Sequence, residues 1–114
     1  MSIFSDFNER RNKGNENISK QDFLPYKRFM NLDTHAYSDG AINIKNKELI
    51  GLACSLLLRC NDCVLYHLQT CVEAGATREE INEAMNISLV IGGSIVIPHL
   101  RSALEALDEL EINQ

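Results

Sequence analysis

The residues best suited to chemistry in this 114-residue chain lie between positions 48 and 67. Cys60 and Cys63 have the spacing of a redox dithiol, and His67 follows the second cysteine by four residues. Residues four apart lie on one face of a helix, so a helix here would place the imidazole beside the Cys63 sulfur. A helix start and a nearby base both favour the thiolate, which is the reactive form of cysteine. The pattern therefore indicates thiol chemistry.

That chemistry would be the reduction of a peroxide or of a disulfide, because a thiolate attacks either. The sulfenic acid that a peroxide leaves must be captured before it oxidises further, and a second thiol three residues away can capture it as a disulfide. His67 is the natural base for Cys63, since an imidazole gains and loses its proton near neutral pH. Glu48, twelve residues before Cys60, could orient His67 if its helix packs against that residue, a contact that the spacing alone does not establish.

The same residues also have structural interpretations. Cys-X-X-Cys alone could be half of a zinc site, but the sequence lacks a second such pair or a His pair, so we expect no metal and no other cofactor. Glu48 could be an acidic residue that the dipole favours in the first turn of a helix. The remaining candidates are expected to be structural or exposed: Cys54 and Cys71 as small buried residues, Tyr66 as a packing residue, and His35 and His99.

The elements that position these residues are predicted to be helices, and the fold class is predicted to be all-α. Residues 1–18 are polar and without periodicity, which predicts a flexible N-terminal arm followed by one helical domain over 19–114. Apolar periodicity and capping signals predict a helix that starts near Ser19 and fades near 31–35, and further helices over about 46–59, 61–75, 77–93 and 96–111. Gly92-Gly93 either ends a helix or allows two helices to approach closely.

Charge and hydropathy limit the partners. The net charge of −5 is opposite to that of most nucleic-acid-binding domains. Residues 1–20 contain no apolar region like that of a signal peptide, and the apolar stretch 49–58 is too short to span a membrane. We therefore expect a cytoplasmic protein that binds neither nucleic acid nor membrane. The segment 46–59 is apolar on nearly all sides, which predicts a closed homo-oligomer, a hexamer built from two trimers.

Several segments together resemble the carboxymuconolactone decarboxylase superfamily, and within it the alkylhydroperoxidase AhpD-like branch. The resemblance covers about residues 20–110 and includes a pattern of Glu, an eleven-residue gap, Cys-X-X-Cys, three residues and His. The segments are Lys47-Glu48-Leu49-Ile50, Cys60-X-X-Cys63-X-X-X-His67, Glu73-Ala74-Gly75-Ala76-Thr77 and Ala103-Leu104-Glu105-Ala106-Leu107.

The resemblance implies an all-helical protein that forms a trimer or hexamer with sites near subunit contacts. It also implies that the protein reduces a peroxide with electrons from a dithiol or protein reductant. It implies that Cys63 is the attacking thiolate, Cys60 the resolving thiol, His67 the base and Glu48 its support. Asp62 departs from the best-studied AhpD proteins, which have a histidine there, and a negative neighbour disfavours a thiolate unless it points to solvent. Two alternatives remain: a lyase acting on a small lactone without a dithiol, and a non-catalytic assembly protein whose dithiol senses redox state.

Overall fold

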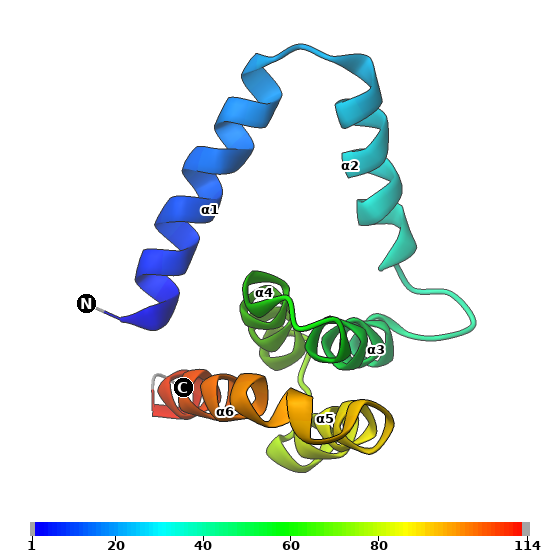
Figure 1. The fold of residues 1–114 in the computed structure, drawn as a ribbon. Helices are drawn as coiled ribbons and strands as arrows, with labels where there is room; N and C mark the ends of the chain where they lie inside the picture. The colour runs from blue at the N-terminus through cyan, green and yellow to red at the C-terminus, as the bar shows by residue number, and fades with distance from the viewer. Residues whose placement is uncertain (1, 113–114) are drawn as a thin grey trace.

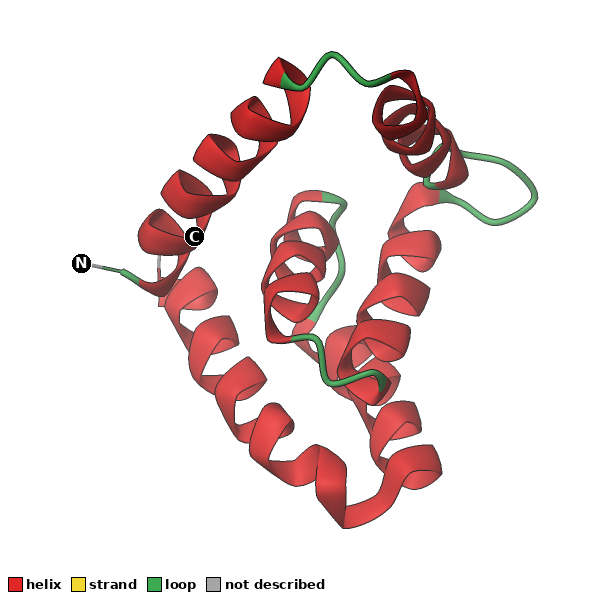
Figure 2. Ribbon diagram, turned by 45° about the horizontal axis from the view of Figure 1, so that its top comes forward, coloured by secondary structure: helices red, strands yellow, loops and turns green. Residues whose placement is uncertain are grey.

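A computed structural model describes residues 2–112, and regular structure within that range is entirely helical (Figures 1 and 2). The all-α prediction is therefore confirmed. Helices α3 to α6 form the body of the molecule, and α1 and α2 rise from it as the two sides of an inverted V (Figure 1). The elements are α1 (Ile3–Lys20), α2 (Leu24–Ala36), α3 (Ile44–Leu57), α4 (Asn61–Glu73), α5 (Arg78–Gly92), the 3-10 helix η1 (Gly93–Val96) and α6 (Ile97–Ile112).

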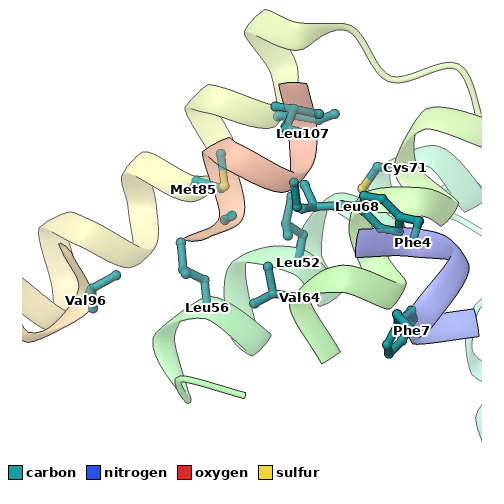
Figure 3. Close-up of a cluster of buried hydrophobic side chains, with 13 residues drawn as sticks. Phe4, Phe7, Leu52, Leu56, Val64, Leu68, Cys71, Met85, Val96 and Leu107 are labelled. Atoms are coloured by element: carbon teal, nitrogen blue, oxygen red, sulfur yellow. The ribbon is translucent and has the colours of Figure 1, made fainter. Parts of the chain in front are cut away.

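Helix α3 lies at the centre of the body. It packs against α4 on one side and α5 on another, while α6 packs against α4. Leu52 and Leu56 of α3 and Leu68 of α4 are completely buried between these helices (Figure 3). This packing buries one stripe of α3, whereas apolar residues on its other face stay exposed. It also fixes the face of α4 that carries His67 against the face of α3 that carries Glu48.

Helix α1 corrects the prediction for the N-terminus. Residues 1–18 were expected to lack regular structure, yet Ile3–Lys20 is helical, with Ser2 and Ser5 forming a reciprocal capping box at its start. Phe4 and Phe7, one turn apart, are buried in the core at 6% and 3% exposure, and they attach one end of a helix whose remaining residues are largely polar. Two anchors are too few to produce a periodic signal. The flexibility of this segment and the domain boundary at residue 19 stay predictions.

The second helix begins later than expected. Residues 19 and 20 belong to α1, Asp22 turns the chain with a φ of 48°, and α2 starts at Leu24. Pro25 lies in the first turn of α2, where its missing N–H leaves no intrahelical hydrogen bond unmade. The expected Ser19 cap is therefore wrong, because the local turn and the proline determine the start. None of the residues of α2 is buried.

The remaining helices follow the predicted order with small shifts. Helix α3 starts at Ile44, capped by Asn43, so Glu48 lies in the second turn and the first-turn dipole interpretation is wrong. The capping box from Thr77 to Glu80 is present at the start of α5. Both interpretations of the glycine pair hold: α5 ends at Gly92, and a Cβ there would lie 3.0 Å from Cδ1 of Leu57 in α3.

One stretch has the length and composition of a membrane span. The segment Arg78–Glu111 reaches a mean hydropathy of 1.5 over an 18-residue window. In the structure this segment comprises α5, η1 and α6, and 17% of the window is buried. Length and composition alone define this stretch, and the absence of membrane binding stays a prediction.

Candidate active site

The dithiol lies at the start of α4. Arg59, with a φ of 61°, reverses the chain after α3, and Cys60 becomes the N-cap residue of α4. The Cys60 sulfur accepts a hydrogen bond from the backbone N–H of Cys63 at 3.3 Å, and the two cysteines are joined as a disulfide. Cys63 is exposed in the first turn, where the unpaired amide groups of the helix favour a negative charge. The expected pairing of these two cysteines is present.

Glu48 and His67 meet in the interior between α3 and α4. Oε1 of Glu48 lies 2.8 Å from Nδ1 of His67, and the two residues are only 4% and 8% exposed. The same oxygen accepts a hydrogen bond of 2.6 Å from Oγ1 of Thr70, one turn further along α4. An ionised carboxylate only accepts hydrogen bonds, so Nδ1 donates to Glu48, and Nε2 is the ring nitrogen that faces other partners. The contact that the sequence left open is thus present.

Gly51 makes this contact possible. It lies nearly one turn after Glu48 on α3, and a Cβ at this position would be 2.6 Å from Cε1 and 2.9 Å from both nitrogens of the His67 ring. Real Cβ atoms do not approach ring atoms so closely. The absence of a side chain at Gly51 therefore allows the imidazole to lie directly against the backbone of α3 while it stays bonded to Glu48.

Two tyrosines surround the outer side of the imidazole. Oη of Tyr37, at the end of α2, lies 3.4 Å from Nε2 of His67, and the two rings are tilted with centroids 5.3 Å apart. Tyr66 presents the edge of its ring to His67 at 5.2 Å, and the guanidinium of Arg11 lies 4.4 Å from the Tyr66 ring centroid. Tyr66 thus makes the packing contacts expected of it.

An open cavity of about 460 Å³ adjoins these groups. Its lining comes from α1, α2 and α4 and includes Cys63, His67, Tyr37 and Tyr66. Because Cys63 and His67 both line this cavity, a small molecule in it could contact both side chains.

The acidic residue between the cysteines is exposed and paired with a basic residue. Asp62 forms a salt bridge with Arg10 of α1, with nitrogen–oxygen distances of 2.9 and 3.4 Å, and both side chains are 61% exposed. Solvent and a guanidinium therefore reduce the effect of its charge on Cys63.

The other cysteines are free thiols outside this arrangement. Cys71 is completely buried, and burial, followed by the charge of Glu48, raises the pKa of its thiol to about 12. Cys54 is exposed, which corrects the expectation that it is buried, because it lies on the face of α3 opposite the core. His99 binds Oδ1 of Asn61 at 2.9 Å, and His35 is exposed, as expected for residues outside the site.

All four sequence-predicted site residues lie at this junction of α3 and α4, and three further ones were missed. Thr70 could have been found, since it follows His67 by three residues on the same helical face. Gly51 and Tyr37 carry no local signal. Among the described residues, no group of three or more His, Cys, Asp or Glu side chains could hold a metal ion.

Comparisons with known proteins agree on one family. The sequence profile of the carboxymuconolactone decarboxylase family matches residues 25–109. An uncharacterised protein from the cox locus of Paracoccus denitrificans is 30% identical over 83 residues, which are 73% of this chain and 75% of that protein. An uncharacterised Cupriavidus necator protein is 35% identical over 75 residues, 66% of either chain.

Solved structures extend the likeness to the fold. Two crystal structures of one Thermotoga maritima protein match this chain over 93% of its length. The first has a TM-score of 0.90 and 52% identity over 93% of its own chain. The second has a TM-score of 0.88 and 53% identity over 90% of its own chain. One of them is described as a carboxymuconolactone decarboxylase family protein, with suggested involvement in an antioxidative response. A Legionella pneumophila protein of the same family matches with a TM-score of 0.86 and 32% identity, over 93% of this chain and 95% of that one. The chain, with its Cys60–Cys63 disulfide and buried Glu48–His67 pair, belongs to the carboxymuconolactone decarboxylase family.

Proposed function

We propose that the protein is a thiol-dependent peroxidase of the AhpD-like branch, which reduces hydroperoxides through its dithiol. The observation that carries the proposal is that the disulfide-linked Cys63 lines the same cavity as His67, whose inner nitrogen is bonded to the buried Glu48. Peroxide reduction requires a dithiol that can form a disulfide and be reduced again, and a base near it that a carboxylate orients.

In the first step the Cys63 thiolate attacks one oxygen of the hydroperoxide. The O–O bond breaks, an alkoxide or hydroxide leaves, and Cys63 becomes a sulfenic acid. His67 accepts the thiol proton at Nε2 before the attack and returns it to the leaving oxygen. Glu48 stabilises the imidazolium that exists between these two transfers, because its carboxylate is bonded to Nδ1.

In the second step the sulfur of Cys60 attacks the sulfur of Cys63. The S–O bond breaks, the leaving hydroxide takes the thiol proton of Cys60 and becomes water, and the disulfide forms. A small dithiol or a reduced protein then transfers two electrons and two protons to the disulfide and is itself oxidised to a disulfide. This cycle needs no metal and no bound cofactor.

The test is peroxide consumption with a dithiol reductant. Cys63→Ser should abolish turnover, and Cys60→Ser should allow a single oxidation of Cys63 followed by over-oxidation. The matched control is Cys54→Ser, which removes an exposed thiol outside the site and should leave the rate unchanged. Peroxide turnover that survives Cys63→Ser would refute the proposal.

The family description favours one alternative, decarboxylation of a small lactone, which does not require a dithiol. That activity should persist in a Cys60→Ser, Cys63→Ser double variant. A protein that forms the disulfide reversibly but turns over neither peroxide nor lactone would instead be a redox-sensing assembly protein.

Self-association is part of the proposal. Large apolar side chains remain exposed on α2, among them Phe29 at 63% and Leu32 at 66%, and on a second face that includes Leu58 at 76% and Val90 at 73%. Exposed apolar surface of this kind in a small domain marks a protein interface. We propose that these faces contact further copies of the chain in a trimer or hexamer. We also propose a cytoplasmic location, where thiol reductants keep such a dithiol reducible.

A further inference from the structure

The outer nitrogen of His67 already has a partner, and that partner is not a sulfur. Nδ1 is committed to Glu48, so protons can enter or leave the ring only through Nε2. Among the described residues, the hydrogen-bond partner of Nε2 is the hydroxyl of Tyr37, at 3.4 Å. Hydrogen bonds of catalytic groups are often long without substrate and shorten when it binds.

Tyr37 also faces the space where a substrate would bind. It is half-buried, and it lines the cavity together with Cys63 and His67. Tyr37 therefore belongs to the cavity wall while its hydroxyl contacts the Glu48–His67 pair. Burial, followed by the charge of Glu48, raises the pKa of Tyr37 above its usual value, so the phenol stays protonated at neutral pH.

The geometry points to Tyr37 as the catalytic residue that carries protons between His67 and the peroxide, an inference that rests on the peroxidase function proposed above. When Cys63 ionises, the hydroxyl donates its proton to Nε2 and accepts the proton of the thiol. When the O–O bond breaks, the hydroxyl protonates the departing alkoxide and recovers a proton from the imidazolium. The thiol proton thus ends on the alcohol, and Tyr37 and His67 return to their starting states.

The test uses peroxides that differ in how much their leaving group needs a proton. Tert-butyl hydroperoxide expels a strongly basic alkoxide, whereas peracetic acid expels acetate, a weak base that leaves without protonation. The rate of Cys63 oxidation in pre-reduced protein is measured with each peroxide in wild type, Tyr37→Phe and Tyr26→Phe. The last variant is a matched control, because Tyr26 is an exposed tyrosine of α2 that does not line the cavity.

We expect Tyr37→Phe to lower the rate with tert-butyl hydroperoxide by about 10²-fold or more, the usual loss for a general acid. The rate with peracetic acid should fall far less, because the Cys63 thiol ionises in an equilibrium that precedes reaction with either peroxide and acetate then leaves without a proton. Tyr26→Phe should resemble wild type with both peroxides. If Tyr37→Phe loses the same fraction of its rate with both peroxides, Tyr37 only positions the site. If the variant loses no rate, Tyr37 takes no part in the reaction. Either result overturns the inference while the peroxidase function stands. A wild-type protein that reduces neither peroxide overturns the proposed function, and the role of Tyr37 with it.

Discussion

Gly51→Ala is the perturbation that tests the geometry of the site most directly. In an ordinary helix this change stabilises, because glycine is about 1 kcal/mol less favourable than alanine in a helix interior. At Gly51 the added methyl would lie 2.6 Å from Cε1 of His67, and ordinary contact begins near 3.4 Å, so the ring must retreat by about 0.8 Å. The ring is bonded through Nδ1 to Glu48 of the same helix as Gly51 at 2.8 Å, so a retreat from α3 would strain that bond.

The expected net effect follows from three contributions. Overpacking of a filled interior costs about 1–3 kcal/mol. Loss of a hydrogen bond to a charged group costs about 1.5–3 kcal/mol. The gain in helix propensity offsets about 1 kcal/mol of this. Gly51→Ala should therefore lower the free energy of unfolding by about 1.5–5 kcal/mol, and turnover should fall because His67 is displaced from its carboxylate.

Gly14→Ala is the matched control. Gly14 is a helical, exposed residue of α1, and no atom outside its own helix lies within 4 Å of a Cβ built there. This variant should gain stability, by up to about 1 kcal/mol. The measurement is chemical denaturation of the reduced protein followed by circular dichroism, together with peroxide turnover. If Gly51→Ala is stabilised as Gly14→Ala is, and keeps full turnover, the imidazole does not lie against α3 in solution and the proposed relay loses its geometric basis.

Three further predictions concern the relay, the dithiol and the assembly. His67→Ala should shift the pH midpoint of Cys63 alkylation upward and lower peroxide turnover about 10²–10⁴-fold near neutral pH, with partial recovery at high pH. Glu48→Gln should change both quantities in the same direction but less strongly. The double variant should lose little more turnover than His67→Ala alone. An unchanged midpoint in His67→Ala would make His67 a packing residue. Mild oxidation should link Cys60 to Cys63 reversibly, which peptide mapping would show, and a dominant link between the other two cysteines would contradict this. Light scattering should report a closed oligomer, and a stable monomer at micromolar concentration would end that proposal.

The part of the site that could be predicted is the part encoded by helical spacing. Cys63 and His67 are four residues apart on α4, so a helix was enough to place them on one face. The contact with Glu48 depended on α3 packing antiparallel to α4, which the apolar character of α3 and the short turn at Arg59 favour but do not specify. Thr70 belonged to the same helical face and could have been named by the same rule.

Tyr37 and Gly51 could not be predicted, because their roles arise from tertiary contacts alone. Tyr37 is thirty positions from His67 on a helix with no buried residue, so no periodic pattern connects the two. In the sequence, Gly51 is only a residue of low helix propensity within an apolar helix. The position of the His67 ring shows why a side chain is excluded there. Helix α1 escaped prediction for a related reason, since its two buried residues, Phe4 and Phe7, lie together at one end.

The position of α1 also bears on Asp62, the residue that sets this site apart from the best-studied AhpD-like proteins. A carboxylate about 4 Å from a thiolate in a solvated setting would disfavour it by about 1 kcal/mol, less than a factor of ten in the thiolate fraction. Asp62 is largely exposed and paired with Arg10 of α1 at 2.9 Å, and Arg10 lines the same cavity as Cys63, so its positive charge offsets part of even this effect. Such an exposed pair contributes little to folding, but it does influence the local potential at the start of α4. The acidic neighbour therefore does not by itself exclude an ionised Cys63, and the N-terminal helix contributes to the electrostatics of the dithiol.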